Sequence, residues 1–313
     1  MSDLPVAEAV VVDDDPITAP LGSRTRSTGR RIKDAALGYA FLLPALIAFA
    51  VFAYYPLYRL FFDSVHHQSR FLNRPPTYVG FDQLADTLRS NEFTSGLGHS
   101  AQFMLYSVPL GLLLGILLAV AAHRRLRGIK VYQAIFSSTV ASSVAVASVI
   151  FFTLVNPVVG YFKDVSWLSL DSPGSAMFSV SLSSVWQNLG LTFIIVLAAL
   201  QAVPEEVNEA ATLDGYSPVR RFLRITIPLI SPALLFLAIV LVISALQAYA
   251  QIEMLTGGGP AGATETLLFK IADPKGIRSL DERAGLSIGL FLLTGAVALV
   301  QYSLLSRRVH YGD

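Results

Sequence analysis

The residues of this sequence best suited to chemistry are polar side chains within segments that are otherwise apolar. The candidates are Gln187, Asn188, Ser244, Gln247, Tyr249 and Gln251. Ser244, Gln247 and Gln251 recur at i, i+3 and i+7, a spacing that places them on one face of a helix. Hydroxyl, amide and aromatic groups suit recognition of a polyhydroxylated solute. They also suit hydrogen bonding between neighbouring helices, and the pattern alone leaves both functions open.

The sequence lacks the residues that covalent catalysis or metal binding would need. It has no cysteine, no HExxH and no GxSxG, and none of its five histidines falls in the middle of an apolar segment. His66 and His67 are adjacent and are expected in a loop, and zinc needs more ligands at other spacings. We therefore expect no catalytic residue and no metal site, so the chain is not expected to be an enzyme.

Composition places the chain among membrane proteins. Hydrophobic residues make up 53% and charged residues 14% of the sequence, and the mean hydropathy is +0.57. Six apolar segments approach the roughly 20 residues needed to cross the hydrocarbon core. They lie at 37–60, 100–122, 131–155, 182–203, 229–250 and 285–305. The sequence therefore predicts an all-α bundle of six transmembrane spans at 35–313, embedded in a lipid bilayer.

The distribution of Lys and Arg predicts the orientation of the spans. Fourteen of these residues lie near the two termini and in the connections after the second and fourth spans, against eight in the longer opposite loops. Positive charge favours the cytoplasmic side, so both termini are expected there. Residues 1–34 are polar and are expected to form a disordered cytoplasmic tail. The net charge of +1 argues neither for nor against a polyanionic partner, and no nucleic acid is expected.

The connection between the fourth and fifth spans, 204–228, predicts two short helices under the bilayer. Pro204 suits the first position of a helix, and Gly215 suits a left-handed helix stop after Asp214. Ser217 is a good N-cap for a second helix, and Pro218 a good first residue. An interfacial amphipathic hairpin without a partner would show the same signals.

The spacing within this connection resembles the EAA loop of ABC-importer permeases. The loop reads Glu209-Ala210-Ala211, three residues that end at Asp214, Gly215, nine residues, and then Ile225-x-Ile227-Pro228. The family usually has Leu where this chain has Ile227. In that family the loop is the coupling helix that docks in a cleft of the ATPase subunit. The resemblance implies the same role here for Glu209, Ala210, Ala211, Asp214, Gly215, Ile225 and Pro228.

Further segments resemble the carbohydrate-uptake group of these permeases, which includes maltose and glycerol-3-phosphate transporters. They are Leu255-Thr256-Gly257-Gly258-Gly259-Pro260 with Thr264-Glu265-Thr266-Leu267, Tyr78-Val79-Gly80-Phe81-Asp82, Leu43-Pro44-Ala45 and Tyr55-Pro56. Gly257, Gly258, Gly259 and Pro260 are expected on the outer side, where a binding protein would dock. No Walker A sequence is present, so ATP and Mg²⁺ are expected on a partner ATPase and no cofactor on this chain.

The resemblance implies a type I importer in a bacterial inner membrane. Its partners would be a second homologous six-span permease, two cytoplasmic ATPase subunits and an extracytoplasmic solute-binding protein. The expected solute is a sugar, a glycerophosphodiester or glycerol-3-phosphate. The alternative is an autonomous secondary transporter or channel, which usually has an internal repeat or a titratable residue at mid-span.

Overall fold

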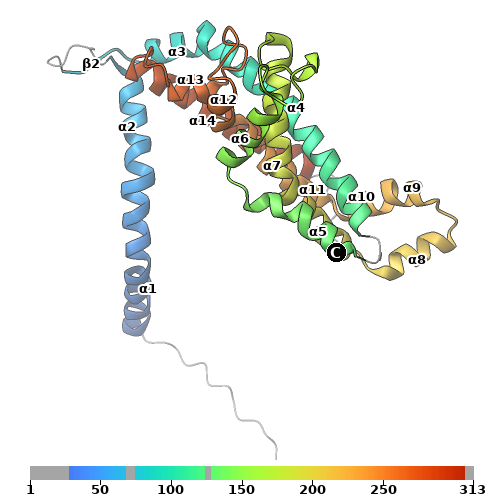
Figure 1. Ribbon diagram of the computed structural model, residues 1–313. Coiled ribbons are helices and arrows are strands. Elements are labelled where there is room, and N and C mark those ends of the chain that lie inside the picture. The colour runs from blue at the N-terminus through green and yellow to red at the C-terminus, as the bar shows by residue number, and fades with distance from the viewer. Residues whose placement is uncertain (1–27, 68–74, 124–127, 307–313) are drawn as a thin grey trace, which may run out of the picture. The chain divides into compact units, whose positions relative to one another are not determined.

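The computed structural model describes residues 28–67, 75–123 and 128–306 (Figure 1). The chain forms two compact units, 1–56 and 57–313. The first contains α1 (Thr28–Phe49) and the π-helical turn η1 (Ala50–Tyr54), which precedes α2 (Tyr55–Ser64). Most of the predicted tail, 1–34, lies outside the described residues, although α1 already begins at Thr28.

The second unit is built almost entirely from helices. In chain order its elements after α2 are β1 (His66–His67), β2 (Thr77–Tyr78), α3 (Asp82–Arg89), α4 (Asn91–Ala122), α5 (Ile129–Ser137), η2 (Ser138–Ala141), α6 (Val144–Val155), η3 (Ser166–Leu168), α7 (Pro173–Gln201), α8 (Glu205–Leu213), α9 (Pro218–Arg221), η4 (Phe222–Thr226), α10 (Ile227–Leu229), α11 (Ser231–Leu246), α12 (Ala250–Leu255), α13 (Leu267–Ala272) and α14 (Leu280–Ser306). The two short strands pair antiparallel, with His66 opposite Tyr78. The predicted all-α class is therefore confirmed.

Four helical segments in the described residues are each long and apolar enough to cross a membrane. They are Tyr39–Ser64, Asn91–Ala122, Pro173–Gln201 and Leu280–Ser303. The predicted third and fifth spans are instead bent pairs, and the number of spans rises to six only if each pair counts as one span. Ile129–Ala141 meets Val144–Val155 at 106°, and Pro218–Leu229 meets Ser231–Leu246 at 72°.

Local chemistry explains both bends. Between the halves of the third segment, Ser142 and Ser143 have extended backbones, and the Ser143 hydroxyl accepts from the Val146 amide, 3.2 Å away, as the N-cap of α6. Serine offers the backbone a bond that competes with helix continuation. At the second bend Ile230 leaves helical geometry, and Pro232 follows in the first turn of α11, where its missing N–H costs least.

Helices α4 and α7 form the centre of the second unit. They approach closely at Gly115, where a Cβ would collide with Thr192 on α7. A second close approach joins η2 to α7, because the Gly190 amide donates to the Thr139 hydroxyl at 2.8 Å. Small residues at such crossings let helix backbones come together, which is how helices associate in lipid.

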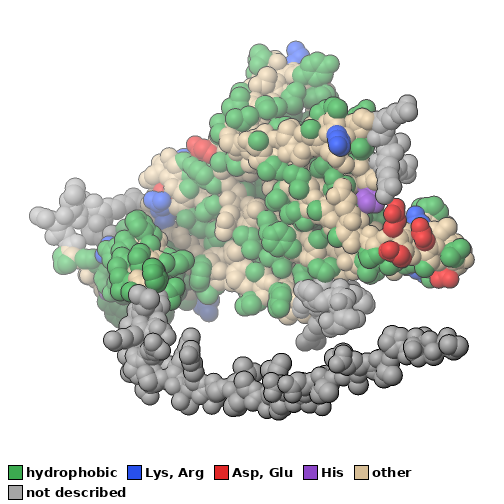
Figure 2. All heavy atoms as spheres, turned by 90° about the horizontal axis from the view of Figure 1, so that it is seen from below, with side chains coloured by type: hydrophobic (Ala, Val, Ile, Leu, Met, Phe, Trp, Pro, Cys, Tyr) green, Lys and Arg blue, Asp and Glu red, His purple; other side chains and the backbone are tan. Residues whose placement is uncertain are grey.

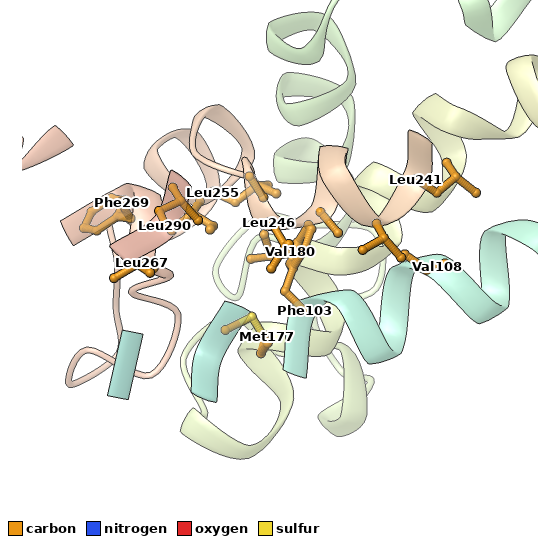
Figure 3. Packing of buried hydrophobic residues seen from close by; sticks show 14 of the residues in the cluster. Phe103, Val108, Met177, Val180, Leu241, Leu246, Leu255, Leu267, Phe269 and Leu290 are labelled. Carbon is orange, nitrogen blue, oxygen red and sulfur yellow. The ribbon is translucent and has the colours of Figure 1, made fainter. Parts of the chain in front are cut away.

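The buried apolar residues gather in two clusters. Figure 3 shows the larger one, where Phe103 of α4, Val180 of α7 and Leu246 of α11 meet. Leu267 and Phe269 of α13 belong to the same cluster. The second cluster surrounds Phe193, Leu200, Ile230 and Leu237, at the end of α7 that leads into α8. Each end of the bundle therefore has its own packed core.

Candidate functional site

The turn after α8 is a complete Schellman motif. Gly215 has a φ of +76°, which glycine adopts without the steric cost of a side chain. Its amide donates to the Thr212 carbonyl at 3.1 Å, and the Tyr216 amide donates to the Ala211 carbonyl at 3.1 Å. Glu205 and Glu206 occupy the first turn of α8, where negative charge is favourable to the helix dipole. The helix begins at Glu205, one residue after the predicted start at Pro204.

Arginine side chains fasten the second short helix to the first. Ser217 caps α9 by accepting from the Arg220 amide at 3.4 Å. The Arg221 guanidinium donates to the Thr212 hydroxyl at 2.9 Å and to the Asn208 carbonyl at 3.3 Å, and both acceptors lie on α8. Arg220 lies over the Tyr216 ring, 5.3 Å from its centroid. The α8–α9 hairpin is therefore held together by its own side chains.

The residues assigned to coupling fall in two places: the surface of the α8–α9 hairpin, and the segment η4–α10 that joins the hairpin to α11 (the root of the hairpin). Glu209, Ala210 and Asp214 are exposed and Ala211 is buried, whereas Ile225 of η4 and Pro228 of α10 are half-buried. Acidic side chains gather at the end of the molecule where α8 lies (Figure 2). The outer face of α8 is therefore acidic and carries a small side chain.

A cavity of about 900 Å³ separates the hairpin from the neighbouring helix ends. Ala122 at the end of α4 and Gln133 of α5 line one side, and Asn208 and Arg221 line the other. The Gln133 amide also donates to the Ala122 carbonyl at 3.2 Å, which satisfies an acceptor at the end of α4. The hairpin thus projects from the bundle on its root at η4 and α10.

The predicted fifth span, 229–250, is interrupted where its polar stripe was expected. Helix α11 ends at Leu246, and α12 begins at Ala250 after a break in which Tyr249 has φ −134° and ψ −59°. The single helical face predicted for Ser244, Gln247 and Gln251 is therefore wrong. Because the backbone turns between them, Ser244 and Gln247 are exposed whereas Gln251 is buried.

Two of the other polar candidates, Asn188 and Tyr249, have partners inside the bundle. The Asn188 amide donates to the Ser184 carbonyl at 2.9 Å and lies 3.2 Å from the Ser184 hydroxyl, one turn earlier on α7. Gln187 is half-buried beside it. The Tyr249 ring packs against Phe269 with its centroid 6.0 Å away. Among the six candidates, Ser244 and Gln247 are thus the exposed pair.

The glycine-rich segment forms a tightly bonded turn. Gly257 and Gly258 have positive φ, and a Cβ on Gly258 would lie 2.7 Å from the Phe269 ring. The Thr264 hydroxyl donates to the Gly259 carbonyl at 2.8 Å. Gly257, Gly259 and Pro260 border a cavity of about 340 Å³. The glycine-rich segment is therefore a hydrogen-bonded turn that borders a cavity.

An ion cluster that sequence reasoning missed lies beside α13. Lys270 is buried, and its ammonium lies 3.0 Å from a Glu92 oxygen that also contacts Arg278 at 2.6 Å. Burial alone would raise the pKa of Asp273, but the backbone N–H groups of Arg278 and Ile277 bond its carboxylate and hold that pKa below its ordinary value. The one available signal was a single lysine in the apolar run Leu267–Ala272.

Among the residues that the structure describes, no group of three or more His, Asp or Glu is placed to hold a metal ion. The described side chains of the site make hydrogen bonds, apolar contacts and ion pairs.

Residues 111–311 match the family model described as binding-protein-dependent transport system inner membrane component. The chain is 33% identical over 284 residues to the sn-glycerol-3-phosphate transport system permease protein UgpA of Yersinia pestis, covering 88% of this chain and 96% of the relative. It is 29% identical to the protein of the same name from Agrobacterium fabrum strain C58, with 88% and 97% covered.

Solved structures share the fold. A chain of the bacterial alginate ABC transporter, in complex with an alginate pentasaccharide-bound periplasmic protein, superposes with a TM-score of 0.75 at 23% identity, covering 91% of this chain and 99% of that one. A chain of the MetNI methionine ABC transporter gives a TM-score of 0.50 at 15% identity, covering 73% and 99%. The chain belongs to the binding-protein-dependent transport system inner membrane components: it is an inner-membrane permease subunit of an ABC importer and not an enzyme.

Proposed function

We propose that this chain pairs with a second homologous six-span permease to form the translocation path for a sugar or a glycerol-3-phosphate-like solute. Two cytoplasmic ATPase subunits, which bind ATP and Mg²⁺, and an extracytoplasmic solute-binding protein complete the importer. The names of the relatives support the solute class, and the alginate transporter structure includes a periplasmic protein. In this arrangement both termini and the α8–α9 hairpin face the cytoplasm.

The observation that carries the proposal is the closed α8–α9 hairpin. Its Schellman turn at Gly215 and the Arg221 contacts to α8 make it a stiff unit, and its root continues through η4 into α11. A stiff element joined to a span passes displacement on to that span. Docking of α8, through Glu209 and Ala210, against an ATPase surface therefore converts ATPase closure into movement of α11.

The outer turn and the broken fifth span are assigned to the solute. Gly257–Pro260 would receive the binding protein, whose release of solute would deliver it to the exposed Ser244 and Gln247. Tyr249, Gln251 and the Gln187–Asn188 pair of α7 are assigned to the same path. Alternating access then follows, with the cavity open outward when ATP closes the ATPase pair and inward after hydrolysis.

Two solute classes, glycerol-3-phosphate and neutral sugars, are each supported by an observation. Names of relatives at 33% identity favour glycerol-3-phosphate. The uncharged character of Ser244 and Gln247 favours a neutral sugar, as does the pairing of Lys270 with Glu92, which leaves that ammonium engaged by a carboxylate. Glycerophosphodiesters lie between these classes, since they carry one negative charge and several hydroxyl groups.

The test is to isolate the subunit with its partners from gently solubilised membranes and to assay ATP hydrolysis. The panel would contain glycerol-3-phosphate, glycerophosphodiesters and disaccharides, each with the co-purified binding protein. Recovery of an ATPase whose hydrolysis is stimulated by one solute class is the expected result. Reproducible isolation of the chain without an ATPase would refute the proposed assembly.

A further inference from the structure

The break in the fifth span is held by a hydroxyl from a distant part of the sequence. The Thr266 Oγ1 donates to the carbonyl oxygen of Ala248 at 2.9 Å, and Ala248 lies in the break between α11 and α12. Thr266 is fully buried and Ala248 is 2% exposed. A buried carbonyl without a partner is costly, so this bond stabilises the broken conformation over conformations that leave the carbonyl unbonded.

The donor itself is fixed from several directions. Thr266 is the N-cap of α13, since its hydroxyl also accepts from the Phe269 amide at 3.4 Å. The next amide, that of Leu267, donates to the buried Ser100 hydroxyl of α4 at 2.9 Å. At the other end of α13 the Arg283 guanidinium of α14 donates to the Ile271 carbonyl at 2.7 Å. Two long helices, α4 and α14, therefore hold the helix that presents this hydroxyl.

Apolar packing surrounds the same contact. Leu246, the last residue of α11, and Leu255, the last residue of α12, lie in one buried cluster with Leu267 and Phe269 of α13 (Figure 3). The Tyr249 ring packs against the Phe269 ring at an interplanar angle of 35°. The end of α11, helix α12 and helix α13 are thus packed as one block, to which the Thr266 hydroxyl adds a polar contact.

We infer that Thr266 is a positioning residue for translocation: it keeps the fifth span broken at Ala248 and thereby sets where Gln247 and Tyr249 lie along the solute path. The assignment of a path to Gln247 rests on the proposed function, but the role of Thr266 in holding the break does not. Two residues before Thr266, Thr264 bonds the glycine turn, so the proposed docking surface and the break belong to one bonded segment.

The experiment uses the assembled importer, in lipid nanodiscs for labelling and in proteoliposomes for uptake, with a single cysteine as reporter. The natural chain has no cysteine, so Gln247→Cys gives one labelling site in this subunit. The rate at which a maleimide labels this site is measured alone, with Thr266→Val and with Thr266→Ser. Valine keeps the shape of threonine and removes the hydroxyl, whereas serine keeps the hydroxyl.

Thr266→Val is expected to change the labelling rate severalfold and to raise the solute concentration for half-maximal uptake about tenfold, the factor typical of one lost buried hydrogen bond. Basal ATP hydrolysis should stay unchanged, and Thr266→Ser should match the Gln247→Cys protein with Thr266 intact in both readouts. An unchanged labelling rate in Thr266→Val would overturn the inference. If that variant does not assemble, Thr266→Ala replaces it, and the same comparison with Thr266→Ser decides.

The proposed path can fail separately. If solute does not slow labelling of Gln247→Cys while Thr266 is intact, Gln247 lies outside the path. A changed labelling rate in Thr266→Val would still support the role of Thr266 in holding the break. Loss of both effects would remove both assignments.

Discussion

Replacing Gly215 by proline should uncouple ATP hydrolysis from solute while leaving the membrane bundle intact. Proline holds φ near −65° and has no N–H, whereas Gly215 has a φ of +76° and donates its amide to Thr212. The turn therefore cannot keep its present geometry in Gly215→Pro. Both hydrogen bonds of the Schellman motif, including the one from Tyr216 to Ala211, are lost together.

The size of the effect follows from those two bonds. Each contributes about 1 kcal/mol, so the ordered end of α8 is destabilised by about 2 kcal/mol relative to a frayed end. Since about 1.4 kcal/mol is a factor of ten, the population of the ordered hairpin relative to the frayed one falls about thirtyfold. The bundle core is not touched, because no atom outside the turn lies within 4 Å of where a Gly215 side chain would begin.

The assay is solute-stimulated ATP hydrolysis by the assembled importer with its loaded binding protein. Gly128→Pro is the matched control, because Gly128 also has a positive φ, +81°, and open space around it, but precedes α5. Size-exclusion chromatography confirms that each variant inserts and folds. Stimulation should vanish in Gly215→Pro and persist in Gly128→Pro. Undiminished stimulation in Gly215→Pro would refute the coupling role of the hairpin.

Three further substitutions test other parts of the account. Gln247→Leu should reduce uptake of radiolabelled solute without lowering basal ATP hydrolysis. Uptake equal to that of the natural protein would favour a helix-packing role for the Gln247 amide. Arg221→Gln removes the contacts of Arg221 to α8 and should lower solute-stimulated ATP hydrolysis severalfold. Arg224→Gln removes an exposed charge nearby and should not lower it. Equal losses in the two variants would show that the Arg221 contacts to α8 are not needed for coupling. Asp273→Asn should lower stability at pH 7 by about 1 kcal/mol, because the lowered pKa of this buried carboxyl means that its charged form stabilises the folded state. That contribution is present above the unfolded pKa and is lost as pH falls through the lower folded pKa, so melting temperatures of the two proteins should converge in acid; a constant difference would show that the charge is not the cause.

Local signals in the sequence were enough to predict the α8–α9 hairpin. Gly215, Ser217 and Pro218 act within a few residues of themselves, and the structure places a left-handed turn and an N-cap at these positions. Capping and turn chemistry depend on nearest neighbours along the chain, which a single sequence records. The all-α class and the apolar segments follow equally from composition and hydropathy.

The broken fifth span could not be predicted in the same way. The stretch from Leu246 to Ala250 contains no proline or glycine, and the hydroxyl that satisfies its carbonyl comes from Thr266, eighteen residues after Ala248. A break held by tertiary contacts leaves no local signal. The bend of the third segment was readable only in part, since Ser142 and Ser143 are as compatible with a continuous helix as with an N-cap.

The buried lysine shows the same limit. Lys270 stands alone in an apolar run of the sequence, and the groups that pair with it when buried, Glu92 and Ser95, belong to α4, far earlier in the chain. Sequence alone gives the charge but not its partner. The structure thus adds the long-range contacts that decide which polar residues are free to meet a solute.

The most direct test of the account is uptake by purified subunits reconstituted into proteoliposomes. The chain belongs to a binding-protein-dependent importer, so solute should accumulate only when the second permease, the ATPase, ATP and the loaded binding protein are all present. Omission of any one should reduce accumulation to the level of empty liposomes. Transport by this chain alone, without ATP, would contradict the account and identify an autonomous secondary transporter.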